Sequence, residues 1–342
     1  MNLNLISRYR QELMGLAMLM VVFHHLAIHG INDAIDFLHL NGGFGVDVFL
    51  LLSGMGLYYS TRNGMDLGRY FLKRLIRIFP LYFAITAVVS FLSGDSFVTW
   101  LLKATTIGSW TSGVMYDWYI PCIVILYLVF PLFHWVTYDR RHGTAIGLAI
   151  VILMYLGFQL LPYGSNFQMW MRWPVFFLGA LLGKWMFCCP NNTAYGGNRL
   201  LLIICVAFTI GLGLSVWEYY AFAQPDLAPS VVPERKLNGW LFRPYFLMVL
   251  CFTWMAAWTV DFALMKRARK ILAWVGAMSL EVYLLHGQFI VLARNISNEY
   301  GLSKPLTSGA LVILSFFVAY GVHKVNVYVT GRLEKKIRND ML

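Results

Sequence analysis

The sequence predicts an all-α protein, a polytopic bundle of about ten transmembrane helices. Hydrophobic residues make up 59% of the 342 residues and charged residues only 13%, whereas an ordinary soluble domain is about 25% charged. The mean hydropathy is +0.64. Apolar segments of about 20 residues, the length that crosses roughly 30 Å of hydrocarbon, recur along the chain. We therefore expect a single transmembrane domain over residues 1–342, without an appended soluble domain.

The expected spans follow one another with short connections. They cover residues 11–29, 42–60, 72–93, 117–137, 143–161, 172–188, 199–220, 239–260, 270–294 and 306–330. Several are interrupted by glycine, proline or a charged residue. Helix bundles tolerate such interruptions where neighbouring helices or cavities satisfy the backbone.

The first segments carry distinct local signals. Arg8 and Arg10 precede the first segment, further spans follow it, and no small-residue cleavage site is evident, which predicts an anchor and not a removable signal peptide. The second segment is rich in glycine, which indicates close helix packing. These glycines are Gly42, Gly43, Gly45, Gly54 and Gly56.

Two later segments contain ionisable residues. Arg172 opens the sixth segment beside Trp170 and Trp173, a combination that suits a glycan, although the membrane interface also recruits tryptophan. Glu281 and His286 lie deep in the ninth segment and are expected to face the bundle interior. Glu281 is expected to be protonated or paired with a cation. The candidate cations are Arg172, Arg243 and Lys184.

The distribution of basic residues predicts the orientation. With a cytoplasmic N-terminus, 20 of the 27 Lys and Arg residues fall on the inner side. The other seven are Lys103, Arg172, Arg235, Lys236, Arg243, Arg294 and Lys304. This asymmetry favours an even number of spans with both termini in the cytoplasm, in the inner or plasma membrane. It also accounts for the net charge of +11 without a nucleic-acid partner.

The cysteines do not indicate a metal site. All five fall inside or at the ends of apolar segments, without the spacing of metal ligands, and are expected to be packing residues. They are Cys122, Cys188, Cys189, Cys205 and Cys251.

A histidine pair stands near the outer end of the first segment. His25 and Asp47 are both expected about 6 to 8 Å below the outer boundary, on consecutive segments. A carboxylate that accepts the proton of one ring nitrogen would fix the tautomer and leave the other nitrogen as a base. The alternative is that the pair only holds two helices together.

An ordered set of motifs carries a resemblance to a known family. The motifs are "ELMGLAMLMVVFHH", "GGFGVDVFLLLSGMGLYY", "FLKRLIRIFPLYF", "DWYIPCIVILYLVFPLF", "RWPVFFLGALLG" and "LAWVGAMSLEVYLLHGQF". Together they resemble the bacterial acyltransferase-3 family of membrane O-acyltransferases. The resemblance implies transfer of an acyl group, above all acetyl, from cytoplasmic acyl-CoA to a hydroxyl of an envelope carbohydrate or related acceptor. Acyl-CoA would be a co-substrate, and no permanently bound cofactor or metal is expected.

The resemblance also implies roles for residues of the first two segments. The family pairs an arginine with a histidine after ten intervening residues, and the matching positions here are Met14 and His25. Arg10, one helical turn earlier on the same face, is a candidate to replace the missing arginine in donor binding. His25 would be the general base or would carry the acyl group itself. His24 would be its packing or hydrogen-bonding neighbour, and Asp47 would orient the ring.

Further candidates concern the two substrates. Lys73, Arg74 and Arg77 suit the phosphates of acyl-CoA, although basic residues at that position also serve orientation and anionic lipid heads. The candidate contacts to the acceptor are Trp118, Arg172, Glu281 and His286. Trp118, Tyr119 or the amides beside Gly42 and Gly43 are candidate oxyanion donors.

Two other classes remain open at this stage. A transporter or flippase of an envelope metabolite would also have many spans and buried charges, but no internal repeat is evident. A membrane sensor or scaffold would need no base. Expected partners are acyl-CoA, the acceptor and membrane lipids, and either a second copy of the chain or a separate extracytoplasmic protein.

Overall fold

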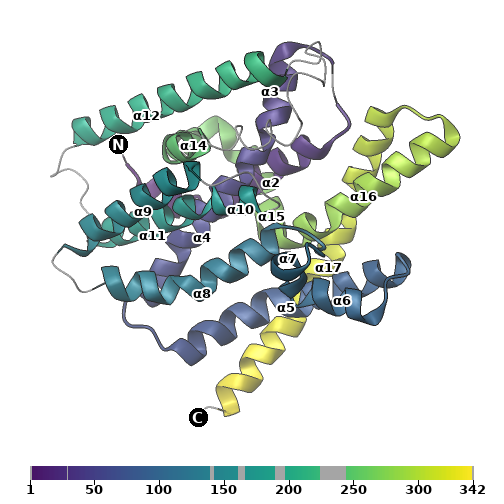
Figure 1. Ribbon diagram of the computed structural model, residues 1–342, viewed down its shortest axis with the longest axis horizontal. Coiled ribbons are helices and arrows are strands. Elements are labelled where there is room, and N and C mark those ends of the chain that lie inside the picture. The colour runs from purple at the N-terminus through teal and green to yellow at the C-terminus, as the bar shows by residue number, and fades with distance from the viewer. Residues whose placement is uncertain are drawn as a thin grey trace. The chain divides into compact units, whose positions relative to one another are not determined.

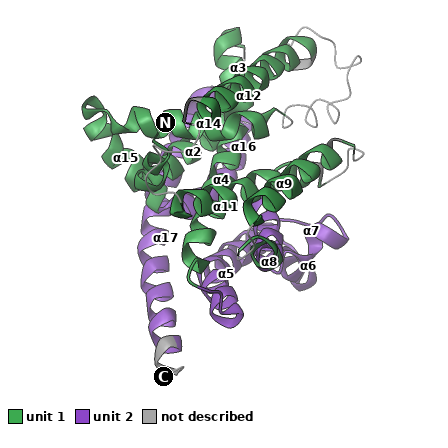
Figure 2. Cartoon of the chain, turned by 90° about the vertical axis from the view of Figure 1, so that its left-hand side faces the viewer, with its two compact units in different colours: residues 1–63, 132–277 green, residues 64–131, 278–342 purple. Residues whose placement is uncertain are grey.

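A computed structural model describes residues 2–28, 30–138, 142–160, 166–188, 197–223 and 244–340. This part of the chain is helical and contains no β-strand, as its hydropathy pattern predicts (Figure 1). The chain divides into two compact units, coloured separately in Figure 2. Unit 1 comprises residues 1–63 and 132–277, and unit 2 comprises residues 64–131 and 278–342.

Unit 1 is built around the second helix of the chain. This helix, α2, packs on α4 and α15, while α11 packs on α4 and α9 on α11. A second pair in the same unit is formed by α12 and α14. The helices are α1 (Asn4–Arg8), α2 (Arg10–His25), α3 (Asp33–Asn41), η1 (Gly42–Phe44), α4 (Gly45–Thr61), α9 (Gly143–Gln159), α10 (Phe167–Trp170), α11 (Trp173–Cys188), α12 (Gly197–Glu218), η2 (Tyr219–Ala223), α14 (Tyr245–Asp261), η3 (Ala263–Met265) and α15 (Lys266–Ala277).

Glycines allow the helix backbones of unit 1 to touch. A Cβ atom on Gly276 of α15 would lie 1.9 Å from the carbonyl oxygen of Gln11 on α2. A Cβ on Gly54 of α4 would lie 1.9 Å from the carbonyl oxygen of Phe176 on α11. Neither position has room for a side chain, so the close packing predicted for the glycines of the second segment is confirmed at Gly54.

Unit 2 contains an antiparallel pair, α16 and α17, on which α5 packs. Gly301 ends α16 with a φ of 64°, a left-handed conformation that glycine adopts without strain. Asp95 lies in the turn between α5 and α6 and accepts a hydrogen bond from Lys103 of α6 at 2.5 Å. This hydrogen bond holds the pKa of the Asp95 carboxyl below its usual range. The helices are α5 (Leu67–Leu92), α6 (Phe97–Ala104), α7 (Ile107–Thr111), the first part of α8 (Tyr119–Thr137), α16 (Ser279–Tyr300) and α17 (Lys304–Asp340).

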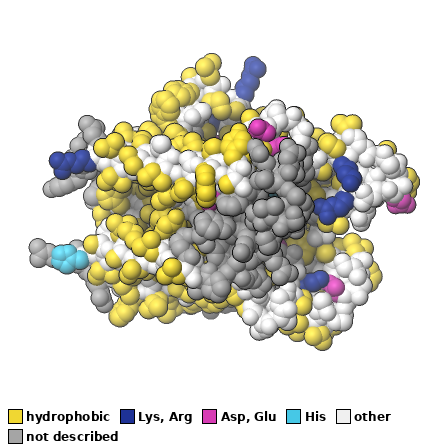
Figure 3. All heavy atoms as spheres, turned by 45° about the horizontal axis from the view of Figure 1, so that its top comes forward, with side chains coloured by type: hydrophobic (Ala, Val, Ile, Leu, Met, Phe, Trp, Pro, Cys, Tyr) yellow, Lys and Arg dark blue, Asp and Glu magenta, His cyan; other side chains and the backbone are white. Residues whose placement is uncertain are grey.

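Several helices are long and apolar enough to cross a membrane. Among the described residues five qualify, and a sixth does if α14 and the helical stretch that follows it, bent by 83°, form one span. The five cover residues 33–61, 67–92, 119–137, 199–221 and 304–337. Large hydrophobic side chains are also exposed, including Phe91 at 84% and Leu202 at 64%, and such side chains occupy much of the face in Figure 3. A multi-pass membrane protein explains both observations.

The helices agree with the predicted segments except in a few places. Each of the ten segments contains a helix in its described part, but α2, α9, α11 and α14 have only 16 or 17 residues. At 16 residues a helix is about 24 Å long, shorter than the roughly 30 Å of a bilayer core. The prediction of ten complete spans therefore stays a prediction.

One predicted segment is divided in two. The segment expected at 270–294 is broken at Met278, because α15 packs on α2 whereas α16 packs on α17. Two connections between predicted segments contain further helices: α6 and α7 lie in residues 94–116, and α3 follows the first segment. Some of the predicted charges and loops lie outside the described residues. These are Arg140, Arg141, Arg235, Lys236, Arg243 and most of the loop expected at 221–238.

Candidate functional site

The candidate site begins where α2 ends, at His24 and His25. Leu26 is extended, with φ −64° and ψ 148°, so the helix stops at His25 and not near residue 29 as predicted. His24 Nδ1 donates to the carbonyl oxygen of His39 at 2.8 Å, and His25 Nδ1 donates to that of Val21 at 2.8 Å. Because a carbonyl oxygen only accepts, each neutral ring carries its proton on Nδ1 and its lone pair on Nε2.

His39 completes a histidine cluster that the sequence analysis missed. It lies on α3, is 5% exposed, and donates through Nε2 to the carbonyl oxygen of Leu26 at 2.8 Å. The ring centroids of His24 and His39 are 5.9 Å apart. Asn32 caps α3 by accepting from the Ile35 amide at 2.9 Å. The polar cap followed by an apolar stretch was a usable signal for this helix.

Two glycines of η1 lie against the His24 ring. A Cβ on Gly42 would lie 2.9 Å from His24 Cβ, so any side chain there would displace the end of α2. A Cβ on Gly43 would lie 3.7 Å from His24 Nε2 and 3.9 Å from Arg172 Nη2. His24 Nε2 therefore faces the same small space as the Arg172 guanidinium. The His25 ring lies 5.0 Å from the His24 ring, centroid to centroid, and the His25 side chain is exposed.

Asp47 and Arg172 form a buried ion pair. Arg172 Nε donates to Asp47 Oδ2 at 3.1 Å, Arg172 Nη2 donates to the Gly43 carbonyl oxygen at 3.2 Å, and both residues are 1% exposed. The expected contact between Asp47 and the His25 ring is thus replaced by this ion pair. A buried carboxylate requires a cation, whereas the two rings already donate to backbone carbonyls. The Arg172 guanidinium, which was considered for contact with a glycan, is thus buried against Asp47.

Three helix N-termini meet at this ion pair. Asp47 lies in the first turn of α4, and Arg172 directly precedes α11. Tyr245, the first residue of α14, donates to Asn41 Oδ1 at 3.0 Å and packs on Phe44 with ring centroids 5.1 Å apart. Helix N-termini carry partial positive charge. The region beside the histidines therefore suits a carboxylate or a developing oxyanion.

Arg10 lies on α2 in the same unit. Its Nε donates to the carbonyl oxygen of Leu52 on α4 at 3.3 Å, and a Cβ on Gly56 would lie 3.0 Å from Arg10 Nη2. Gly56 thus makes room for the guanidinium between α2 and α4. Met14, one turn further along α2, is 8% exposed.

The predicted phosphate-binding residues lie on α5 in unit 2. The Arg74 guanidinium is half-buried, lies 4.5 Å from the centroid of the Tyr70 ring and donates to the Tyr70 carbonyl oxygen at 3.4 Å. Lys73 and Arg77 are exposed. Lys73 and Arg77 are therefore more accessible to a phosphate than Arg74 is.

Trp118 and His286 belong to an aromatic cluster in unit 2. The ring centroids of Tyr119 and Tyr283 are 5.1 Å apart, those of Tyr283 and His286 are 5.8 Å apart, and Trp118 packs on Tyr119 at 6.2 Å. Asp117, which the sequence analysis missed, accepts from the Ile120 amide at 2.8 Å and from the Tyr283 hydroxyl at 3.4 Å. A carboxylate at the start of an apolar segment was the available signal.

Glu281 has partners that differ from the predicted ones. Its Oε1 accepts from His323 Nδ1 at 3.0 Å and from Asn326 Nδ2 at 2.8 Å, and the residue is 2% exposed. Arg172 is paired with Asp47, and Lys184 donates to the carbonyl oxygen of Thr137. Arg243 lies outside the described residues. Both partners come from α17. Which residues of α17 lie beside Glu281 depends on how α16 and α17 pack, and a local sequence pattern does not contain this information.

The histidine cluster is not arranged as a metal centre. In the described part of the chain, no group of three or more His, Cys, Asp or Glu residues could hold a metal ion. The described side chains of the site carry imidazole, carboxylate and guanidinium groups.

The fold and the site define a class of protein: a helical multi-pass membrane protein with a histidine pair beside a buried carboxylate and guanidinium. Residues 13–324 match the acyltransferase-3 family, whose description is "Acyltransferase domain". The chain belongs to this family.

One relative supports the same class. A protein of Acidianus two-tailed virus, described as "Putative acetyltransferase ORF330", is 29% identical over 181 residues, which are 49% of this chain and 53% of the viral protein. The chain thus matches about half the length of this curated relative. No solved structure matches the chain significantly.

Proposed function

We propose that the protein is a membrane O-acyltransferase that moves an acyl group, above all acetyl, from acyl-CoA to a hydroxyl of an envelope carbohydrate or related acceptor. His25 is the general base. The observation that carries this proposal is the hydrogen bond from His25 Nδ1 to the Val21 carbonyl oxygen, because it leaves the lone pair on Nε2 of an exposed ring. Family membership supports the reaction class.

The reaction needs one proton acceptor and one site for negative charge. His25 Nε2 takes the hydroxyl proton as the hydroxyl oxygen attacks the thioester carbonyl carbon. A new C–O bond forms, the C–S bond breaks, and the proton passes from the imidazolium to the departing thiolate. The carbonyl oxygen is negatively charged in the intermediate, and the helix N-termini around Asp47 and Arg172 favour such a charge.

The donor is proposed to bind through its phosphates to basic residues of α5. Lys73 and Arg77 are exposed and supply charge, while Arg74 is held against Tyr70. Guanidinium groups match the geometry of phosphate oxygens. Arg10 is the proposed additional donor contact of unit 1, and Arg10→Ala is expected to weaken acetyl-CoA binding.

The acceptor is proposed to contact the aromatic cluster of unit 2. Trp118 and His286 are both members of it, and aromatic rings with a nearby carboxylate, here Asp117, suit a sugar. Glu281 makes two hydrogen bonds to α17, which favours a role in holding α16 and α17 together.

The proposal is tested on the two adjacent histidines. The measurements are CoA release by the purified full chain and the acetyl content of envelope glycans, determined by mass spectrometry of cells that contain each variant. His25→Ala is expected to lower transfer by about 10²–10⁴-fold, the usual contribution of a general base, with acetyl-CoA binding retained. His24→Ala is the matched control and is expected to retain most of the activity.

Three outcomes would contradict the proposal. Full activity of His25→Ala, with loss of activity in His24→Ala, would move the base to His24. Full activity of both variants would remove histidine from the mechanism. Acyl transfer would be excluded if the protein without substitutions released no CoA with any glycan fraction and if its presence left glycan acetylation in cells unchanged.

A further inference from the structure

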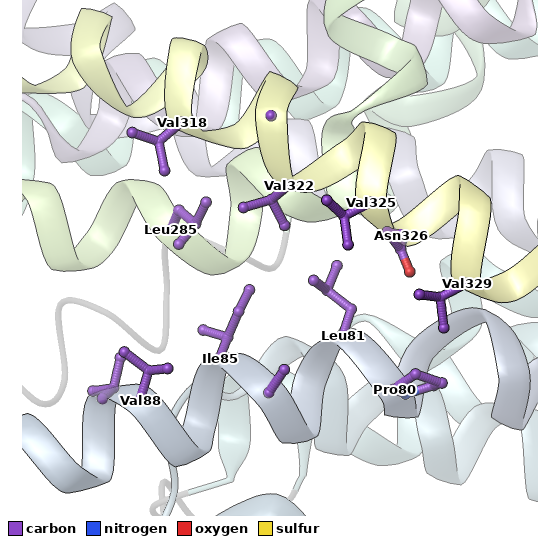
Figure 4. Close-up of a pocket in the computed structure, with 13 residues that line it drawn as sticks. Pro80, Leu81, Ile85, Val88, Leu285, Val318, Val322, Val325, Asn326 and Val329 are labelled. Atoms are coloured by element: carbon purple, nitrogen blue, oxygen red, sulfur yellow. The ribbon is translucent and has the colours of Figure 1, made fainter.

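Unit 2 contains an apolar groove that the proposed reaction does not use. It lies between α5, α16 and α17 and has a volume of about 640 Å³ (Figure 4), within the roughly 300–1,000 Å³ typical of ligand sites. Side chains from α5 and α17 face one another across it. They include Pro80, Ile85 and Val88 from α5 and Val318, Val322 and Val329 from α17.

The lining of the groove favours hydrocarbon over a polar substrate. Asn326 is the single lining residue with a polar side chain, and its Nδ2 donates to Glu281 Oε1 at 2.8 Å. A sugar or a nucleotide would have to give up its hydrogen bonds to water in such a groove, which is unfavourable.

The groove is also elongated. Val88 lies opposite Val318 at one end, and Pro80 lies opposite Val329 at the other (Figure 4). The stretch of α17 from Val318 to Val329 is about 16 Å long at ~1.5 Å per residue. An extended alkyl chain has this shape.

Two exposed basic residues of α17 lie beyond one end of the groove. Arg332 follows Val329 by three residues and Lys336 follows it by seven, so both continue the lining face of α17. Both side chains are exposed, and Arg332 Cζ lies 4.6 Å from the centroid of the Tyr328 ring. Beyond the opposite end, acidic and basic residues are mixed: Asp95 pairs with Lys103, and Arg294, Glu299 and Lys304 lie near the turn between α16 and α17. A ligand with one apolar part and one anionic end complements this arrangement.

We propose that the groove binds one acyl chain of an anionic phospholipid, whose phosphate is bound by Arg332 and Lys336. A guanidinium and an ammonium group suit the phosphate oxygens, and the hydrocarbon lining suits the chain. Arg77 also lies at this end of the groove, three residues before Pro80, but it already belongs to the proposed donor site. The lipid site does not depend on the acyl-transfer reaction.

The first test compares three probes that share parts of the proposed ligand. The full chain is purified in detergent, depleted of lipid, and its melting temperature is measured with phosphatidylglycerol, with phosphatidylcholine of the same acyl chains, or with glycerol 3-phosphate. Phosphatidylglycerol is expected to raise the melting temperature, and native mass spectrometry is expected to show one tightly bound molecule per chain. Equal stabilisation by phosphatidylcholine, or stabilisation by glycerol 3-phosphate, would overturn the proposal.

The second test fills the groove. Val322→Trp is expected to abolish stabilisation by phosphatidylglycerol. Its control is Val327→Trp, because Val327 is 54% exposed, does not line the groove and lies on the same helix. Gly321→Leu is a second filling variant, since a Cβ on Gly321 meets no atom within 4 Å. If both filled variants keep the melting temperature of the lipid-free protein and still bind the lipid, the groove is not the site.

The third test removes charge at the basic end. Arg332→Gln is expected to weaken phosphatidylglycerol binding roughly fivefold, the usual effect of one basic residue near an anionic lipid. Lys324→Gln is a matched control, because Lys324 is also exposed and its Nζ lies 4.5 Å from the ring of the tyrosine four residues earlier. Equal effects of the two substitutions would show that only general surface charge attracts the lipid, and would overturn the site.

Discussion

At the scale of single residues, the buried pair of Asp47 and Arg172 organises the end of unit 1 that holds the histidines. The sequence predicts Asp47 and His25 at one depth, since depth follows from counting along consecutive segments. The partner of Asp47 is not predictable in this way, because Arg172 is 125 residues away and no local pattern joins them. The carbonyl partners of His24 and His25 leave no trace in the sequence, since every residue has a carbonyl.

Removal of one member of this pair is expected to destabilise the fold strongly. Asp47→Leu or Arg172→Met alone should lower the free energy of unfolding by about 3–5 kcal/mol, because either change leaves an uncompensated buried charge. The double variant should recover most of this loss. Thermal or chemical unfolding in detergent measures the effect.

Arg8→Met is the control for the buried pair. Arg8 and Asp261 are 3.8 Å apart with side chains 67% and 39% exposed, and such a surface pair contributes about 0–1 kcal/mol. Strictly additive effects of Asp47→Leu and Arg172→Met would show that the two groups do not depend on each other.

At the scale of helices, local hydropathy predicted where helices occur but not how they pack. All ten predicted segments contain a helix because long apolar stretches satisfy their backbone only in this way within a membrane. The break at Met278 depends on two different packing partners, α2 and α17, which a local pattern does not contain. The same reason explains why the approach of α2 to α15 at Gly276 was missed, whereas the glycine-rich α4 gave a visible signal.

Alanine at a contact glycine is expected to separate two helices. Gly54→Ala and Gly276→Ala should each destabilise unit 1 by about 1–3 kcal/mol, because the added Cβ would overlap a backbone carbonyl oxygen at 1.9 Å. Gly287→Ala on α16 is the control, since a Cβ there meets no atom within 4 Å. It should be neutral or slightly stabilising, because alanine favours helix. A melting temperature unchanged in all three variants would refute the close contacts.

At the scale of the whole molecule, the basic residues predict an orientation that the helices alone do not determine. Five or six described helices can span a membrane by length and apolarity. The count of about ten rests on the apolar segments, and the even number of spans with cytoplasmic termini rests on the distribution of 27 Lys and Arg residues. The packing of the helices does not determine the orientation, because the same helix packing is compatible with either direction of insertion into the membrane.

Cysteine labelling is expected to place two turns on opposite sides of the membrane. In a cysteine-free background, Asn63→Cys lies in the turn between α4 and α5, and Leu302→Cys lies in the turn between α16 and α17. A membrane-impermeant maleimide should label Leu302→Cys in intact spheroplasts, and Asn63→Cys only after permeabilisation. Labelling of both from the same side would contradict the even number of spans and the orientation.

The hydrogen bonds of the paired imidazoles have a consequence for genetics. Both acceptors are main-chain oxygens, of Val21 and His39, so no codon change can delete them. A library of point substitutions would therefore not identify the groups that fix the tautomers of the two rings. Only backbone chemistry, such as an ester that replaces the amide after Val21 and weakens its carbonyl as an acceptor, addresses that bond directly.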